Sequence, residues 1–343
     1  MIRILHGADL HLDSPFSSLP PEEAAYSRQL QRQIPQMLAK LGNEKNCQIM
    51  LLAGDIFDSE EVHPKTLQAL YNGLAQFRGK VFIAPGNHDP YTDISVWAQA
   101  EWPDNVHIFT KNQECVVLEE LGCRVHGGAF FRDVCNEPLP RVERQGYIEL
   151  GVFHGDCTTD SDYRPITASQ IEGSGLDYLA LGHIHKRSIP KKQGKTWYGW
   201  PGAAMGRGFD ETGLCGVFLI DMEEDCCRGE FLPLPLPRYE IITAVPGCAP
   251  QLPEDAGNCR VRMRLVGQCE APDVPRLFKE YEKQVLSLQI VDETQPVEDL
   301  WDSCGDGSLR GLALDAIRGC DDPELAALAA KYLLCALEGR DAP

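Results

Sequence analysis

The stretch PGNHDP, residues 85–90, places an amide, an imidazole and a carboxylate side by side directly after the apolar run VFIA, residues 81–84. A short apolar run of this kind is typical of a buried β-strand. Polar side chains at the end of such a strand are costly unless they bind a ligand or take part in a reaction. The stretch therefore predicts a functional site at the carboxyl end of a strand.

Four more polar clusters follow apolar runs in the same way. They are ADLHLD with Asp9 and His11, AGDIFD with Asp55 and Asp58, GVFHGD with His154, and LALGHIHK with His183 and His185. An Asp-x-His or His-x-His pair projects both side chains from the same face of an extended segment, so both can reach one metal ion. Carboxylate, imidazole and amide groups together are a ligand set that suits Mn, Fe or Zn. Five of the nine histidines lie in the five clusters, which favours a metal centre over isolated core histidines.

The order of elements predicts an α/β fold. Strands are expected at residues 2–5, 49–52, 81–84, 149–153 and 178–181, and helices at 21–41 and 64–77, where apolar residues recur at helical spacing. Alternation of this kind puts polar groups at the carboxyl ends of the strands. From residue 116 the chain becomes richer in strands.

The proline-rich stretch FLPLPLPR, residues 231–238, cannot be a central strand because proline removes donors from the hydrogen-bond ladder. It predicts a stiff connector, with a domain boundary between residues 237 and 238. A small α+β domain is expected beyond it, with strands at 239–245, 260–266 and 288–291 and helices at 275–286, 309–318 and 323–338.

The composition narrows the class of protein. The chain has 343 residues and a formal net charge of −19, and a globally acidic protein does not bind nucleic acid through bulk electrostatics. Its 14 cysteines are scattered without a C-x-x-C pair, and the first residues do not resemble an export signal. We therefore expect reduced thiols, a cytoplasmic location and no membrane span.

The ordered motifs D-x-H, G-D-x-x-D, G-N-H-[DE], a lone His and G-H-x-H together resemble the signature of calcineurin-like metallophosphoesterases. GADLHLDSPF, GHIHK and YGWPGAAMGRGFDETGLCGVFLID are similar to SbcD-type DNA-repair exonucleases, especially the YhaO-like branch. The resemblance covers about residues 1–235. It implies a four-layer α/β/β/α sandwich, joined here to the small α+β C-terminal domain.

The resemblance also implies two divalent metal ions, expected to be Mn²⁺, with Fe or Zn as alternatives. Asp55 would bridge them, Asp9, His11 and His185 would complete the first site, and Asn87, His154 and His183 the second. Two such ions can neutralise a phosphate diester and activate a water molecule. His88 would help the leaving oxygen as a general acid, Asp58 resembles the residue that keeps this histidine protonated, and Asp89 is expected to support the turn.

One basic segment stands out against the overall acidity. KRSIPKKQGK follows His185 directly and contains Lys186, Arg187, Lys191, Lys192 and Lys195. It is either an exposed hairpin with ordinary surface charges or a contact surface for backbone phosphates. Arg207 is a weaker candidate for the same contact.

We therefore expect a DNA exonuclease or endonuclease of SbcD type that acts in repair. The alternatives are a phosphatase or nucleotide phosphodiesterase acting on a small molecule or phosphoprotein, and a non-catalytic scaffold subunit. The resemblance further implies an SbcC-like coiled-coil ATPase as partner, and a homodimer is also an expectation. The segment DPELAALAAKYLLCALEG carries an apolar stripe at helical spacing that a partner helix could cover.

Overall fold

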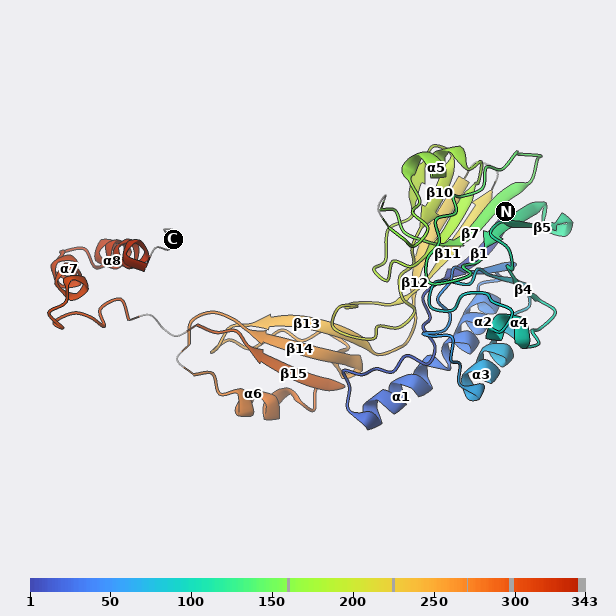
Figure 1. The fold of residues 1–343 in the computed structure, drawn as a ribbon. Helices are drawn as coiled ribbons and strands as arrows, with labels where there is room; N and C mark the ends of the chain where they lie inside the picture. The colour runs from blue at the N-terminus through green and yellow to red at the C-terminus, as the bar shows by residue number, and fades with distance from the viewer. Residues whose placement is uncertain (159–160, 224–225, 270, 296–298, 339–343) are drawn as a thin grey trace. The chain divides into compact units, whose positions relative to one another are not determined.

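The computed structural model describes residues 1–158, 161–223, 226–269, 271–295 and 299–338 (Figure 1). The chain divides into two compact units that alternate along the sequence. The first unit comprises Met1–Ile241, Pro253–Arg262 and Glu282–Leu288. The second comprises Ile242–Leu252, Met263–Tyr281 and Gln289–Pro343. The boundary predicted at residues 237 and 238 stays a prediction.

The first unit contains two six-stranded sheets. The first sheet has the order β12-β11-β1-β2-β3-β4. Its strands are β1 (Ile2–Gly7), β2 (Ile49–Leu52), β3 (Lys80–Ile83), β4 (Val106–Ile108), β11 (Gly216–Glu223) and β12 (Cys226–Pro233). Strands β1 to β4 are parallel, and β11 pairs antiparallel with both β1 and β12.

The second sheet has the order β5-β6-β7-β8-β10-β9. Its strands are β5 (Glu114–Leu118), β6 (Cys123–Gly128), β7 (Ile148–His154), β8 (Tyr178–Gly182), β9 (Lys191–Gln193) and β10 (Thr196–Gly199). Strands β6, β7, β8 and β10 are parallel, and β5 and β9 pair antiparallel at the two edges.

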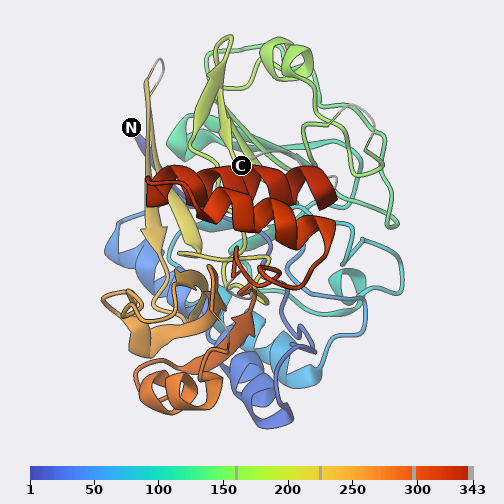
Figure 2. The same ribbon diagram turned by 90° about the vertical axis from the view of Figure 1, so that its left-hand side faces the viewer.

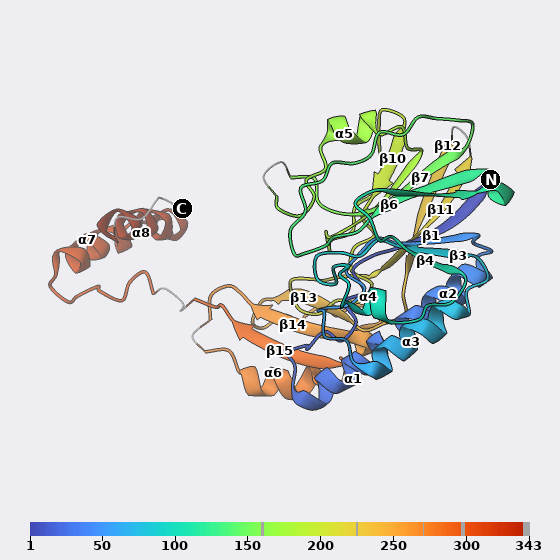
Figure 3. The same ribbon diagram turned by 45° about the vertical axis from the view of Figure 1, so that its right-hand side comes forward.

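The two sheets pack face to face, with helices on their outer faces (Figure 3). Successive residues of a strand face opposite sides, so Ile4 lies between the sheets while Leu5 lies under the helices. The layer between the sheets includes Ile49, Leu51, Phe82, Val125, Val152 and Ala180. The outer apolar layers include Leu38, Leu70 and Leu74 on the first sheet and Ile171 and Leu176 on the second. The predicted α/β/β/α arrangement is confirmed.

The helices of the first unit are α1 (Pro21–Gln31), α2 (Ile34–Glu44), α3 (Pro64–Ala75), α4 (Val96–Gln99) and α5 (Ala168–Gly173), with 3₁₀ turns η1 (Glu119–Leu121) and η2 (Ala256–Asn258). The single helix predicted over residues 21–41 is wrong, because α1 and α2 are separate. Pro35 lies in the first turn of α2, where proline is tolerated. In the interior of a longer helix it would remove a hydrogen bond and clash with the preceding turn.

The predicted connector at residues 231–238 also needs correction. Strand β12 continues to Pro233, and it lies at the edge of its sheet, where a proline need not donate to a neighbour. Leu234 and Leu236 are buried in the core beside the helices. The stretch is therefore an edge strand followed by a segment packed on the core. Its leucines alternate with prolines, so the leucine side chains point inward.

A smaller sheet of order β13-β14-β15 follows. It consists of β13 (Arg238–Ala244), β14 (Cys259–Leu265) and β15 (Ser287–Asp292), which confirms the three predicted strands. Within the second unit, the helix predicted at 275–286 is the shorter α6 (Val274–Tyr281).

The predicted helices α7 (Leu309–Arg318) and α8 (Pro323–Glu338) are present and lie side by side (Figure 2). Leu314, Ala330 and Leu334 form the buried core of this pair. Among the described residues, no helix combines the length and the apolar character needed to cross a membrane.

Candidate metal centre

Strand ends from both sheets of the first unit converge on one place. Asp9 and His11 follow β1, Asp55 follows β2, Asn87 follows β3, His154 ends β7, and His183 and His185 follow β8. Within each sheet these strands are parallel neighbours, so their carboxyl ends lie at the same edge. The seven side chains predicted as metal ligands are therefore brought together by the topology.

The first donor set consists of Asp9, His11, Asp55 and His185. One ligand atom from each lies within 4.8 Å of the others. Nε2 of His11 and Nε2 of His185 face each other at 3.0 Å. Two imidazole nitrogens directed at one point, next to two carboxylates, are suited to share a divalent ion.

The second donor set consists of Asp55, His154 and His183, whose ligand atoms also lie within 4.8 Å of one another. Asn87 completes it, because its Oδ1 lies 2.9 Å from His154 Nε2 and 3.2 Å from His183 Nδ1. His154 Nδ1 donates to the carbonyl of Ala53 at 2.9 Å, which leaves Nε2 for a metal. Asp55 belongs to both sets and is the natural bridge between them.

The backbone around the two sets adopts strained conformations. Asp9, His11, Asp55 and His183 all have positive φ, at 51°, 43°, 50° and 93°. For non-glycine residues this costs on the order of 1–3 kcal/mol each, and it persists where the surrounding structure imposes it. Gly86 is needed for a different reason, because a Cβ there would lie 2.2 Å from Oδ1 of Asp55. The polypeptide is thus built around the positions of these ligands.

One orphaned atom tests whether a metal fits this chain. Asp9 Oδ1 accepts a hydrogen bond from the backbone N–H of His183 at 2.9 Å, whereas Asp9 Oδ2 is buried and has no hydrogen-bond partner. A buried carboxylate oxygen without a partner costs several kcal/mol unless a cation compensates it. Asp9 belongs to the first donor set together with two imidazoles, so the residues present fit a divalent ion.

Electrostatics within the two sets point in the same direction. Burial raises the pKa of Asp9, because the charged form loses its hydration. Burial alone would lower the pKa of His154, but Asp55, 3.3 Å away, and Asp9 raise it to about 9. Burial lowers the pKa of His183 to about 4. Metal binding would replace the proton of His154, so metal affinity should fall in acid.

His88 lies beside both donor sets but belongs to neither of them. Its backbone N–H donates to Asp55 Oδ1 at 3.0 Å, and its side chain is exposed. Nδ1 of His88 lies 2.9 Å from the main-chain carbonyl of Asp58, to which it can donate. The Asp58 carboxylate instead accepts from Ser14 and Arg207, so contact between these two predicted catalytic residues runs through the backbone.

Asp89 supports the turn that carries Asn87 and His88. Its carboxylate accepts hydrogen bonds from the backbone N–H groups of Ile56, Phe57 and Gly86 at 2.7–3.0 Å. Burial, together with the nearby charge of Asp55, raises the pKa of Asp89 to about 8. It therefore joins the turn after β3 to the turn after β2.

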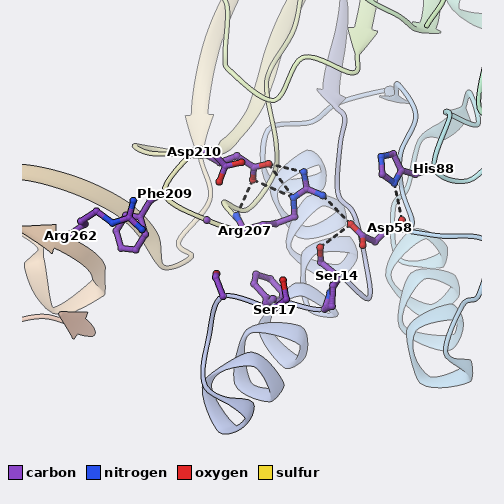
Figure 4. Close-up of a pocket in the computed structure, with 13 residues that line it drawn as sticks. Ser14, Ser17, Asp58, His88, Arg207, Phe209, Asp210 and Arg262 are labelled. Carbon is purple, nitrogen blue, oxygen red and sulfur yellow. Dashed lines mark hydrogen bonds and ion pairs between the residues drawn. The ribbon is translucent and has the colours of Figure 1, made fainter. Parts of the chain in front are cut away.

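A groove of about 680 Å³ opens beside His88 (Figure 4). Its lining includes Ser14, Phe16, Asp58, Arg207, Phe209 and Arg262. The guanidinium of Arg262 lies over the ring of Phe209, 4.1 Å from its centroid. The groove is mixed in charge and has aromatic surfaces, which suits a ligand with both polar and planar parts.

The predicted basic segment leads from His185 into β9 and the turn before β10, and its five cations are all exposed. Lys186 and Arg187 lie next to His185. Lys195 lies at the opposite end, because β10 is parallel to β8 and pairs Trp197 with Tyr178. At about 3.3 Å per residue, this register puts Lys195 roughly 20 Å along the sheet from His183. Lys186 and Arg187 directly follow the predicted ligand His185 in the sequence, and the guanidinium of Arg187 lies over the ring of Phe231, 4.0 Å from its centroid.

The sequence reasoning missed Glu211. Its carboxylate lies 2.8 Å from Nδ1 of His185 and accepts from Arg207 at 2.7 Å. Burial would raise the pKa of Glu211, but His185 and Arg207 lower it to about 2. Glu211 lies in GRGFDETG, part of the stretch that is similar to SbcD-type exonucleases. No periodic spacing in the sequence links Glu211 to His185.

Comparisons with known proteins agree with this geometry. The family model described as calcineurin-like phosphoesterase matches residues 2–187. The uncharacterized metallophosphoesterase YhaO of Bacillus subtilis is 30% identical over 250 residues, covering 67% of this chain and 60% of that protein, so the match spans less than two thirds of the relative. The DNA double-strand break repair protein Mre11 of Methanopyrus kandleri is 22% identical over 356 residues, covering 92% of this chain and 76% of that protein.

Among solved structures, wild-type Vps29 from Entamoeba histolytica aligns with a TM-score of 0.34 and 14% identity, covering 68% of this chain and 99% of that one. The family match is the decisive finding, because it spans more than half of the chain and contains all seven converging ligands. The chain belongs to the calcineurin-like phosphoesterase family.

Proposed function

We propose that the protein is a dinuclear-metal phosphodiesterase that cleaves DNA, in the manner of an SbcD-type nuclease. The observation that carries this proposal is the pair of donor sets that share Asp55, with the exposed imidazole of His88 beside them. A shared carboxylate between two histidine-containing sets suits two divalent ions, for which we propose Mn²⁺. When bound, such a pair neutralises a phosphate diester and activates water for attack.

The residues of the chain divide the remaining work. Asp9, His11 and His185 would hold the first ion, and Asn87, His154 and His183 would hold the second. His88 donates a proton to the departing sugar oxygen through Nε2, because its Nδ1 is engaged by the carbonyl of Asp58. General acid catalysis of this kind contributes about 10²–10⁴-fold to the rate.

DNA as the substrate is supported by the relative in Methanopyrus kandleri, a DNA double-strand break repair protein that matches 92% of this chain. Lys186 and Arg187 lie next to the ligand His185 and would contact backbone phosphates. The net charge of −19 opposes long-range attraction of DNA. Local cations and the metal ions must therefore supply the binding charge.

The same acidity favours a second candidate, a phosphatase or nucleotide phosphodiesterase with a small or phosphoprotein substrate. One assay separates the two. Labelled single- and double-stranded DNA, bis-p-nitrophenyl phosphate and p-nitrophenyl phosphate are compared with Mn²⁺ at low salt. The proposal expects cleavage of DNA and of the diester, with the monoester slow. Rapid monoester turnover with intact DNA would refute the nuclease and support the second candidate.

A partner surface is the last part of the proposal. We propose that a coiled-coil ATPase of SbcC type docks on α7 and α8. Leu325, Leu328 and Tyr332 on α8 are about half exposed, at 56%, 49% and 46%, although the pair has its own core. An apolar stripe left outside that core suits a partner helix. Such a partner would also supply positive surface for DNA.

A further inference from the structure

The loop between β10 and β11 is attached to the first donor set by its backbone. The N–H of Ala203 donates to the carbonyl of His185 at 3.0 Å, and that of Ala204 donates to the carbonyl of Asp9 at 3.3 Å. Gly202 has φ +81°, and a Cβ there would lie 2.5 Å from the carbonyl oxygen of His185. Only glycine permits this approach, so the loop is packed directly against two ligand residues.

Farther along the same loop, Glu211 reaches the imidazole of His185. Nε2 of His185 faces the other donors, so its Nδ1 must carry the proton. Nδ1 then donates to Glu211 Oε1, 2.8 Å away. Nη2 of Arg207 also lies 3.0 Å from Nδ1, but both are donors, and Arg207 donates to Glu211 Oε1 at 2.7 Å instead.

The second histidine of the first set has a similar neighbour. Nδ1 of His11 lies 3.2 Å from Asp58 Oδ1, close enough for an ionic contact although not aligned as a hydrogen bond. The same carboxylate oxygen accepts from Ser14 Oγ at 2.9 Å and from Arg207 Nη1 at 3.0 Å (Figure 4). Arg207 therefore joins Asp58 to Glu211, and each of these carboxylates lies behind one histidine.

We propose that Glu211, Arg207 and Asp58 form a positioning network that orients both histidine ligands of the first metal ion. The inference rests on the proposed two-metal centre and assigns a role to residues outside it. In this proposal Arg207 acts through the two carboxylates that its guanidinium contacts. The phosphate contact expected for Arg207 from the sequence stays a prediction. In the second set, a main-chain carbonyl fixes His154. His183 Nε2 lies 3.9 Å from Asp156 Oδ2, a carboxylate outside this network.

This difference predicts that the two sites can be separated by mutation. Outer partners of metal ligands typically contribute about 10- to 100-fold to metal affinity. Glu211→Ala should weaken one of two Mn²⁺ binding events by about that factor and leave the other unchanged. Glu211→Gln, which keeps an acceptor for Nδ1, should recover part of the loss. Arg207→Lys should weaken Mn²⁺ binding about as much as Glu211→Ala does. A single lysine ammonium cannot replace a guanidinium that contacts two carboxylates at once.

The experiment is Mn²⁺ titration of the metal-free protein by calorimetry, with Mn²⁺ electron paramagnetic resonance to distinguish one bound ion from a coupled pair. Asp210→Asn is the matched control, since it removes a neighbouring charge from the same loop. Thermal unfolding of each variant in EDTA checks that the fold is retained, and Glu211→Gln gives a readout even if Glu211→Ala misfolds.

Equal weakening of both events, or no change in either, would overturn the inference. So would an equal loss in Asp210→Asn, because the effect would then be the charge of the loop and not the contact with His185. A wild-type protein that binds fewer than two Mn²⁺ ions would instead overturn the proposed function, and the inference with it. The two failures are therefore distinguishable.

Discussion

Replacing His88 with alanine should separate catalysis from metal binding. The side chain is exposed and makes one hydrogen bond, from Nδ1 to the carbonyl of Asp58 at 2.9 Å. Loss of one such bond lowers the free energy of unfolding by only about 0.5–1.5 kcal/mol. Loss of the general acid should lower the rate of DNA cleavage about 10²–10⁴-fold, which corresponds to a barrier higher by about 2.7–5.4 kcal/mol.

The leaving group tests the role more sharply than the rate alone. A deoxyribose oxygen needs a proton as it departs, whereas p-nitrophenolate is stable as an anion. His88→Ala should therefore lose far more activity on DNA than on bis-p-nitrophenyl phosphate. His63→Ala is the control, because His63 is also exposed and only caps α3 through Nδ1. Metal analysis accompanies both assays. Equal losses on the two substrates, or loss of metal, would refute the assignment.

Four further outcomes are expected. Asp55→Asn should lower the occupancy of both metal sites in elemental analysis, because a shared carboxylate cannot be lost from one site alone. His6 is held neutral, since burial lowers its pKa to about 3 from 6.5. As the pH falls, His6 takes up a proton in the unfolded chain before it does so in the folded protein. The free energy of unfolding should therefore drop between pH 6.5 and 3 by up to about 1.4 kcal/mol per pH unit. Denaturant unfolding of His6→Gln at several pH values should show a shallower decline than the wild-type protein. Neutralising Lys186 and Arg187 should weaken DNA binding and flatten its salt dependence, with little change in bis-p-nitrophenyl phosphate turnover. A chain ending at Gln295 should keep its metals and its small-diester activity but fail to co-purify with a coiled-coil ATPase, and retained binding would place the docking site elsewhere.

Much of the centre was predictable because the ligands follow strands. Asp-x-His after β1 and His-x-His after β8 marked the right residues, but the expected geometry of an extended segment with a shared face is wrong. Asp9, His11 and His183 have positive φ. His183 and His185 belong to different donor sets, so this His-x-His pair does not converge on one ion. The parallel order of β1, β2 and β3 then brings their ends together without further information. The assignment of each ligand to one of two ions, however, came from the resemblance and not from spacing.

The misses have physical causes. The break between α1 and α2 depends on Pro35, which lies in the first turn of α2. The apolar periodicity continues across this proline, so periodicity alone predicts one helix. Glu211 meets His185 through a loop without regular structure, so neither a period of two nor one of 3.6 could reveal it. Arg207 and Asp58 are 149 residues apart, and their contact depends on the packing of the β10–β11 loop beneath the first donor set.

The position of the centre at the seam between the two sheets explains why so strained an arrangement is tolerated. The first sheet contributes Asp9, His11, Asp55 and Asn87, and the second contributes His154, His183 and His185. Buried acids and positive φ angles are costs that local contacts do not offset. The apolar layer between the sheets is continuous, and His6 adds polar links across the seam to Tyr178 and to the carbonyl of Leu181. Packing of the sheets therefore fixes where the strands end, and the short turns beyond them must present their ligands from those positions. The fold thus sets the location of the donors before any metal binds, while side chains such as Glu211 and Arg207 set only the orientation of the imidazoles.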